Sequence, residues 1–212
     1  MNEKIKPFWD KNAMRYDDSE RKSEAVNKEI LAKTGKYLNA NDKVLDFGCA
    51  TGNKVIELSK KVKFIHGLDL SPEMISLANQ KKDALNIHNI SFSSGTIFND
   101  EFKPDSFDKI VSFAVIHLLE DKEDVIKRIH ELLKPGGLFI SVIPCFKDKK
   151  AFSKGLEIKI YLLMKKLGIF PLHLNMFTTK DVENLITSHH FKTIETERIF
   201  DGISASFVVA QK

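Results

Sequence analysis

The 212-residue sequence has few of the features that mark exported, membrane-spanning or nucleic-acid-binding proteins. Its two cysteines, Cys49 and Cys145, are too few for a disulfide framework, which favours a reducing compartment. No uncharged apolar run approaches the roughly 18–20 residues that cross a bilayer, and the first residues contain no apolar core of an export signal. We therefore expect a cytoplasmic protein with no integral membrane contact.

Arginine is also scarce, because only Arg15, Arg21, Arg128 and Arg198 accompany 29 lysines. Proteins that read nucleic acids depend on arginine forks, so we expect no nucleic-acid partner. The net charge of +4 is mild and is typical of lysines on a solvated surface. One segment differs, since residues 147–176 contain seven lysines against two acids and so carry a charge of +5.

Strands and helices alternate along most of the chain. Apolar runs predict strands at 43–47, 63–70, 90–94, 107–113 and 137–143, with helices at 51–61, 73–84 and 122–133 and a turn at 134–137. This alternation is typical of βαβ units with a parallel sheet. The last two runs, 191–200 and 203–210, are separated by Asp201 and Gly202, which predicts an antiparallel hairpin at one edge. We expect one domain over residues 1–212, with helices in 1–40.

The segment from Val44 to Gly52 carries the most information about a ligand. The first strand brings Asp46 to its carboxyl end, where open α/β sheets bind ligands, and a glycine loop follows. Dinucleotide binding requires G-x-G-x-x-G, but Ala50 and Asn53 occupy the second and third glycine positions. A carboxylate beside a pyrophosphate is also unfavourable, whereas it suits a ligand with a cation, such as the ammonium of S-adenosylmethionine.

A second acid, Asp69, ends the next predicted strand, 17 residues after Gly52. A carboxylate at this position can accept hydrogen bonds from both ribose hydroxyls of either class of cofactor. Because both acids follow adjacent strands, together they predict a nucleoside-containing ligand more specifically than either acid does alone.

Four segments in register carry a family resemblance. Asp46–Gly52, Gly67–Ile75, Phe107–Ser112 and Leu132–Leu138 resemble, in order and spacing, the class I S-adenosylmethionine-dependent methyltransferases, most of all the small-molecule branch of ubiquinone and menaquinone biosynthesis. The resemblance implies an α/β, Rossmann-like fold with strand order 3-2-1-4-5-7-6, strand seven antiparallel, helices on both faces and a small helical cap. It also implies S-adenosyl-L-methionine as cofactor, S-adenosyl-L-homocysteine as product and direct in-line transfer to a small-molecule acceptor.

The resemblance also implies which residues contact the cofactor. An N-terminal tyrosine, Tyr16, would close over the carboxylate of the cofactor, and the acid that usually follows Gly95 is replaced by Thr96 and Ile97. No metal site is predicted. The implied cofactor-binding residues are Tyr16, Asp46, Gly48, Cys49, Ala50, Gly52, Asp69, Leu70, Met74, Thr96, Ile97, Ser112 and Phe113.

Two further residues are candidates for the chemistry itself. His117 follows the fourth predicted strand and is the best-placed general base, because an ordinary imidazole titrates near neutrality. Such a base is needed only for a protonated nucleophile, and the alternative is a histidine that packs in its loop. Cys145 matches the place of a nucleophile in RNA cytosine methyltransferases, but we favour a cysteine in the pocket wall.

Residues 147–176 are predicted to form a cap or lid. An apolar row with helical spacing runs through 152–167, and it fits either a lid over an apolar or anionic substrate or a basic helix on a membrane surface. We favour the lid, which is also a plausible homodimer surface. The aromatic residues expected to form a substrate chamber are Phe146, Phe152, Phe170, His173 and Phe177.

Three classes of function therefore stay open. A methyltransferase acting on a small molecule comes first. A protein that binds S-adenosylmethionine without catalysis comes second, because the acid after Gly95 is missing. An NAD-dependent oxidoreductase comes last, because the glycine spacing disagrees with it.

Overall fold

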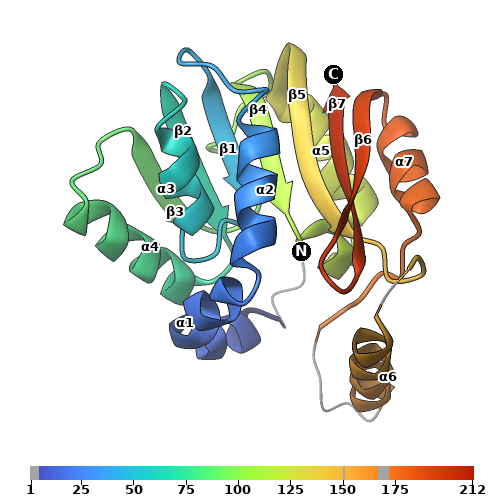
Figure 1. The fold of residues 1–212 in the computed structure, drawn as a ribbon. Helices are drawn as coiled ribbons and strands as arrows, with labels where there is room; N and C mark the ends of the chain where they lie inside the picture. Colours follow the sequence, from blue (N-terminus) through green and yellow to red (C-terminus); the bar gives the residue numbers. More distant parts are fainter. Residues whose placement is uncertain (1–4, 150, 167–171) are drawn as a thin grey trace.

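A computed structural model describes residues 5–149, 151–166 and 172–212. Seven strands form one sheet in the order β3-β2-β1-β4-β5-β7-β6, as Figure 1 shows. The first five strands pair in parallel, and β7 runs antiparallel between β5 and β6. This topology confirms the predicted fold. The strands are β1 (Lys43–Phe47), β2 (Phe64–Asp69), β3 (Ile90–Ser94), β4 (Phe107–Phe113), β5 (Leu133–Pro144), β6 (Lys192–Phe200) and β7 (Ser204–Gln211).

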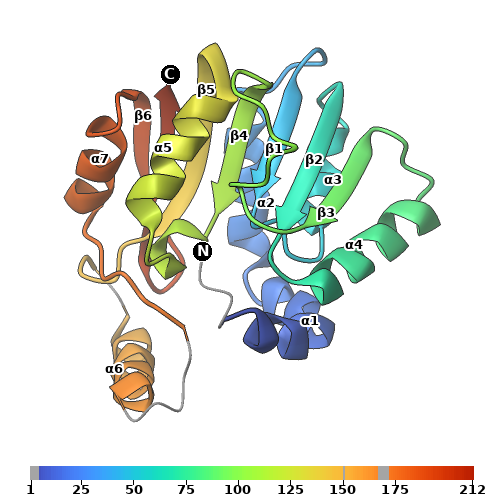
Figure 2. The same cartoon turned by 180° about the vertical axis from the view of Figure 1, so that it is seen from behind.

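Helices cover both faces of the sheet (Figures 1 and 2). One core contains side chains of α2, α3 and α4, and the other contains side chains of α5 and α7. Helix α1 crosses the carboxyl ends of the strands, and α6 stands apart from the sheet at that same end. The helices are α1 (Lys6–Arg21), α2 (Glu24–Thr34), α3 (Asn53–Ser59), α4 (Pro72–Ala84), α5 (Lys122–Leu132), α6 (Phe152–Lys166) and α7 (Thr179–Thr187), with a 3-10 turn η2 (Ile116–Leu118).

Strand β1 is buried on both faces, as its continuous apolar run predicts. Leu45 and Phe47 point into the core beneath α5 and α7, whereas Val44 points into the core beneath α2 and α3. Asp46 alternates with Leu45 and therefore faces the α2–α3 side. The parallel register aligns Asp46 with Gly67 of β2, so the carboxyl ends of the two strands meet at one edge.

The predicted turn at 134–137 is wrong, because these residues belong to β5. The strand begins at Leu133, which pairs with Phe107, and the register then shifts so that Lys109 pairs with Leu138. Gly136, at φ +76°, absorbs the irregularity. A bulge places the extra residues inside the strand, and local turn chemistry alone does not distinguish a bulge from a connecting turn.

Candidate functional site

The loop between β1 and α3 packs too tightly for side chains at two positions. Gly48 and Gly52 have φ near +80°, and an added Cβ at Gly48 would lie 2.2 Å from Cγ2 of Val115. At Gly52 the added Cβ would lie 2.7 Å from Cζ of Phe92. Ala50 adopts φ +48° between them, a left-handed conformation that costs an alanine about 1–2 kcal/mol.

The carboxylate of Asp69 ties the end of β2 to this loop. It accepts hydrogen bonds from the backbone N–H of Ala50 at 2.8 Å and from that of Ser71 at 3.0 Å. Burial raises the pKa of Asp69, and the backbone donors only partly oppose this effect. Because each carboxylate oxygen has a second lone pair, Asp69 can still accept hydrogen bonds from a ligand.

Asp46 is buried without a full set of partners. Asp46 is 1% exposed, and its Oδ1 has no hydrogen-bond partner among the described residues. Burial raises its pKa to about 7; Lys54 lowers it, while Asp69 and Glu20 raise it further. A buried carboxylate with an unpaired oxygen favours a neighbouring cation, so the chemistry of this position suits a positively charged ligand.

Helix α1 covers the loop with aromatic side chains. Trp9 and Tyr16 of this helix line the cavity, together with Ile5 just before it. The pKa of the Tyr16 phenol is raised by burial first, and then by the carboxylates of Glu20 and Asp69. The phenol therefore stays protonated and can donate a hydrogen bond.

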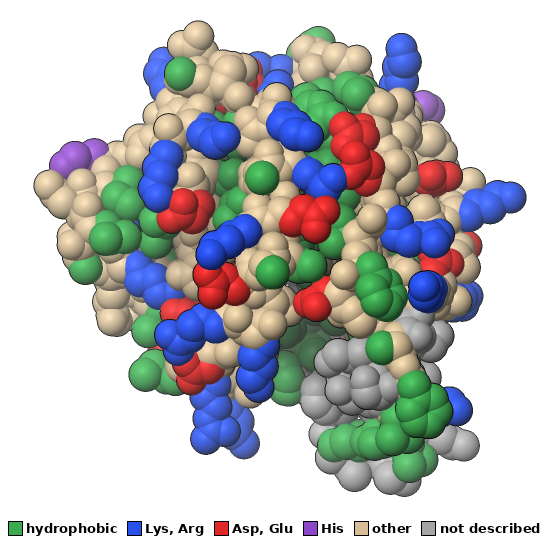
Figure 3. Space-filling view, in the orientation of Figure 1, with side chains coloured by type: hydrophobic (Ala, Val, Ile, Leu, Met, Phe, Trp, Pro, Cys, Tyr) green, Lys and Arg blue, Asp and Glu red, His purple; other side chains and the backbone are tan. Residues whose placement is uncertain are grey.

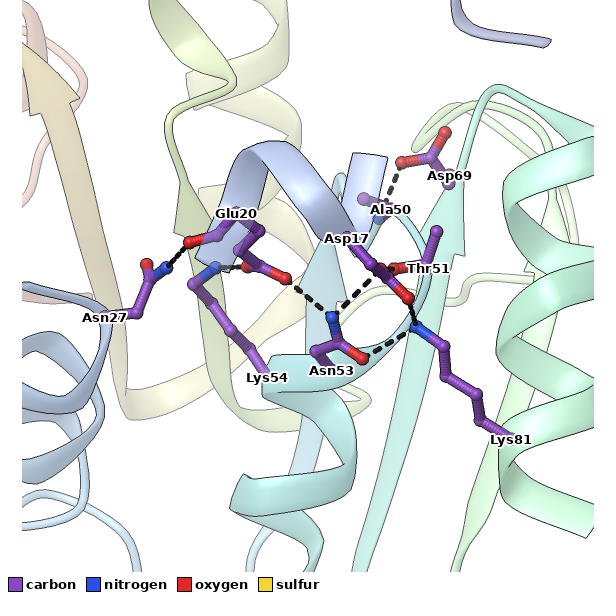
Figure 4. Close-up of polar contacts among 9 residues, drawn as sticks. All are labelled: Asp17, Glu20, Asn27, Ala50, Thr51, Asn53, Lys54, Asp69 and Lys81. Carbon is purple, nitrogen blue, oxygen red and sulfur yellow. Dashed lines mark hydrogen bonds and ion pairs between the residues drawn. The ribbon is translucent and has the colours of Figure 1, made fainter. Parts of the chain in front are cut away.

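A polar network holds the second half of α1 in place (Figure 4). Asp17 accepts hydrogen bonds from the Thr51 hydroxyl and from Nδ2 of Asn53 at 3.0 Å, and it pairs with Nζ of Lys81 at 2.6 Å. Glu20 accepts from Nδ2 of the same Asn53 at 2.7 Å and from the Lys54 ammonium. The network joins α1 to the beginning of α3 and to α4.

Between α1 and the strand ends lies a cavity of about 630 Å³, including its open mouth. Seven of the predicted cofactor residues lie in its wall: Tyr16, Gly48, Ala50, Asp69, Leu70, Met74 and Phe113.

Sequence reasoning missed most of the apolar wall. The helical spacing of Trp9 from Tyr16 was the signal available for α1, because residues seven apart share a helix face. Apart from Ile5, which precedes α1, the others follow β4 or lie within buried strands, where an apolar residue is expected for packing alone. The missed wall residues are Ile5, Trp9, Phe47, Leu68, Val115, Leu118 and Leu119.

Six predicted cofactor residues lie outside the wall: Asp46, Cys49, Gly52, Thr96, Ile97 and Ser112. The Cys49 thiol packs against β2, so close that an added Cβ on Gly67 would lie 2.9 Å from Sγ. Ile97 is fully buried in the α5–α7 core, and the Ser112 hydroxyl donates to the carbonyl of Phe47 at 3.0 Å. Cys49, Ile97 and Ser112 therefore pack behind the wall.

His117 also lies outside the wall, although Leu118 and Leu119 beside it are part of it. Its ring packs against Phe146 with centroids 5.6 Å apart, and burial lowers its pKa to about 3. The imidazole is therefore neutral at pH 7 and a weak base. This geometry favours the alternative that His117 packs in its loop, where its carbonyl accepts the backbone N–H of Asn175 at 2.7 Å.

The predicted aromatic chamber is wrong for the residues that the structure describes. Phe152 is 92% exposed, Phe146 and Phe177 are buried, and His173 is half-buried; none of these four lines the cavity. Phe170 lies outside the described residues. The spacing of aromatic residues predicts which face of a helix is apolar, but it does not predict what that face packs against.

Cys145 is likewise not part of the cavity wall. It is fully buried, and burial raises the pKa of its thiol to about 11. A thiol with so high a pKa carries almost no thiolate at neutral pH and is a poor nucleophile.

Within residues 5–149, 151–166 and 172–212, no group of three or more His, Cys, Asp or Glu side chains is arranged to hold a metal ion. Of the helices in the same ranges, none is long and apolar enough to cross a membrane.

The comparisons with known proteins agree on one family. A family model described as a methyltransferase domain matches residues 38–197. Phosphoethanolamine N-methyltransferase of Plasmodium falciparum is 28% identical over 179 residues, which are 83% of this chain and 62% of that protein. The uncharacterized methyltransferase YcgJ of Bacillus subtilis is 29% identical over 64% of this chain and 53% of its own length. The chain thus spans about half to three-fifths of the length of these relatives.

Solved structures share the fold. An SAM-dependent methyltransferase from Methanosarcina mazei superposes with a TM-score of 0.67 at 24% identity, covering 84% of this chain and 95% of that one. Phosphoethanolamine N-methyltransferase 2 of Haemonchus contortus, solved with phosphomonomethylethanolamine and S-adenosylhomocysteine, gives a TM-score of 0.71 at 18% identity. The superposition covers 87% of this chain and 53% of the Haemonchus contortus protein.

Proposed function

Because the chain belongs to the family of S-adenosylmethionine-dependent methyltransferases, we propose that it transfers a methyl group from this cofactor to a small, largely apolar acceptor. One observation carries the proposal. Two carboxylates, the buried Asp46 and the partly buried Asp69, lie at the ends of adjacent strands beside a cavity whose wall is otherwise mostly apolar.

The residues present fit the cofactor. Asp69 would accept the ribose hydroxyls, and the unpaired oxygen of Asp46 provides a negative charge for the amino-acid end. Leu70 and Met74 supply an apolar surface for the adenine, and the Tyr16 phenol can donate to the cofactor carboxylate. Gly48 contributes its backbone to the wall, and the absence of its side chain leaves room for Val115, another wall residue. Cys49, Gly52, Thr96, Ile97 and Ser112 would act by holding this wall in place.

When bound, S-adenosylmethionine supplies a methyl carbon that its positive sulfur already activates. The contribution of the chain is then to position the acceptor and to exclude water. Trp9 and Leu119 wall the cavity from α1 and from the segment after β4, and both serve this purpose. Since His117 is buried with a lowered pKa, we favour an acceptor atom that is nucleophilic without a protein base.

The wall also indicates the class of acceptor. It contains no Lys, Arg or His among the described residues, although phosphorylated groups are usually bound by such side chains. We therefore favour an apolar acceptor over a phosphorylated amine such as those named for two of the relatives. Assignment to the ubiquinone and menaquinone branch stays a prediction.

Cofactor binding can be measured directly, because Trp9 is the single tryptophan and lies in the wall. We expect S-adenosylmethionine and S-adenosylhomocysteine to change its fluorescence and NAD to leave it unchanged. Asp69→Asn should weaken cofactor binding about tenfold or more through the lost charge-assisted hydrogen bonds. Asp18→Asn, on the exposed side of α1, is the matched control. Binding of NAD alone would overturn the proposal.

Transfer is tested with methyl-labelled cofactor and a small-molecule extract, with phosphoethanolamine in a parallel sample. We expect label in an apolar product and none in phosphoethanolamine. His117→Asn should keep most of the activity, whereas a hundredfold loss with unchanged cofactor affinity would restore His117 as the base. Tight cofactor binding with no labelled product would instead favour a protein that binds the cofactor without catalysis.

A further inference from the structure

Helix α6 exposes an apolar row along one side. Phe152 is 92% exposed, and Leu156, Ile160 and Leu163 are each more than half exposed. Their spacing of four, four and three residues places them on one face of a helix. Ile158, on the opposite side of the helix, is buried. Figure 3 shows hydrophobic side chains gathered on this projecting part of the molecule. Large contiguous apolar surfaces of this kind mark sites of interaction.

Positive charge accompanies the row. Lys159 of α6 is exposed, as are Lys147 and Lys149 just before the helix. Residues 147–176 as a whole carry +5, while the complete chain carries only +4. The combination of an apolar face with surplus lysine is typical of helices that lie in the interface of an anionic bilayer.

Helix α1 presents a smaller surface of the same kind at the same end of the molecule (Figures 1 and 2). Met14 is 80% exposed, and its neighbours Lys11 and Arg15 are exposed beside it. Helices α1 and α6 both lie beyond the carboxyl ends of the strands. Two separate elements therefore place apolar and basic side chains at one end.

We propose that this docking surface, formed by Met14, Lys11 and Arg15 of α1 and by the exposed row of α6, binds the surface of an anionic phospholipid bilayer. A second copy of the chain fits less well, because a symmetric contact would oppose two +5 segments. A lid over the cavity also fits less well, because no described residue of α6 lines the cavity wall.

Docking in this way would bring the cavity close to the lipid. The wall residues Ile5, just before α1, and Trp9, in its first turn, belong to the same end of the molecule as the docking surface. An apolar acceptor dissolved in the bilayer would then reach the cavity without passing through bulk water. This consequence rests on the proposed function, whereas the docking itself does not.

The test is co-sedimentation of the full chain with phosphatidylcholine vesicles, with and without about one-third phosphatidylglycerol. We expect binding to the anionic vesicles, at least about tenfold weaker binding to neutral ones, and release at high salt. Replacing two exposed side chains of the row, Leu156→Asp with Ile160→Asp, should weaken binding about tenfold or more. Leu85→Asp, equally exposed but at the end of α4, is the matched control.

The substituted side chains are all exposed, so an unchanged Tm verifies that each variant is folded. Failure to sediment with either kind of vesicle would overturn the proposal, as would equal loss in the control variant. A dimer that dissociates on the α6 substitutions, in a protein that does not bind vesicles, would assign the row to a second copy. Because no cofactor is present, none of these results depends on methyl transfer.

Discussion

At Gly48 the backbone itself limits what the site can tolerate. Its positive φ disfavours any side chain, and Val115 fills the space where a Cβ would lie. The glycine therefore serves two needs at once, a left-handed conformation and a close packing contact. These needs can be separated experimentally, because Gly136 has a similar φ of +76° with no atom closer than 3.7 Å to its added Cβ.

We expect Gly136→Ala to cost about 1–2 kcal/mol of unfolding free energy, from the conformation alone. Gly48→Ala should cost about 1–3 kcal/mol more, because its methyl group also overlaps Val115. Urea denaturation of both variants measures the difference. The double change Gly48→Ala with Val115→Ala should recover part of the additional loss, and equal costs at the two glycines would contradict the packing account.

Asp46 makes the stability of the protein depend on pH in a direction opposite to most carboxylates. Burial raises its folded-state pKa to about 7, while the unfolded chain titrates near ~4. The folded state thus binds more protons between these values, so the stabilising contribution is present at low pH and is lost as pH rises from about 4 to 7. Above pH 7 Asp46 is mostly ionised, and burial of its charge then lowers the free energy of unfolding by its full amount.

Asp46→Asn should remove this dependence. Relative to the parent chain, the variant gains stability as pH rises, by up to about 4 kcal/mol for a shift of three pKa units. Thermal or urea unfolding of both proteins at pH 5 and pH 8 gives the difference. The same variant should bind S-adenosylmethionine more weakly, since it lacks the negative charge. A stability difference that does not change between the two pH values would show that Asp46 is not the buried titrating group.

Among the elements, α1 depends most on polar contacts for its position. Its buried surface is small, with Ala13 as the buried residue in the helix, and Asp17 and Glu20 join it to α3 and α4. An element held by a few partly exposed polar contacts opens more easily than the sheet beneath it. Since the same helix carries Trp9 and Tyr16, its position also determines whether the cavity is closed.

We expect Asp17→Ala to weaken cofactor binding about tenfold while costing only about 1–2 kcal/mol of global stability, because three polar contacts are lost at the edge of the fold. Amide hydrogen exchange should accelerate in α1 but not in the strands. Asp18→Ala is the control, since Asp18 pairs with Arg21 on the exposed side of the helix. Loss of affinity without faster exchange in α1 would argue against a positioning role for the network.

Over the whole molecule, charge is unevenly distributed. Asp46 and Asp69 lie at the ends of two adjacent strands beside the cavity, while the surplus of positive charge belongs to residues 147–176. A net charge of +4 is thus a sum over regions of different character. The net charge of a chain is therefore weak evidence about its binding partners, whereas a local charged patch is stronger evidence.

Much of this architecture follows from local sequence. Short sequence patterns, read with the general rules for parallel sheets, predict the strand order and the hairpin at Asp201 and Gly202. They also predict that Asp46 and Asp69 lie at the same edge of the sheet. Such patterns act over a few residues, so they are visible without a structure. The same holds for the failed dinucleotide spacing at Ala50 and Asn53, which left a cationic ligand as the better expectation.

Tertiary structure decided the rest. The sequence pattern of α6 predicts an amphipathic helix, but only the fold shows that Phe152 faces away from the cavity. The position of His117 after β4 suggests a base, and only its burial against Phe146 lowers its pKa to about 3. Burial and orientation depend on residues distant in sequence, so no short pattern contains them. The amino-acid sequence alone thus determined the sheet and predicted the edge at which the cavity lies, while packing determined which side chains line the cavity and which face outward.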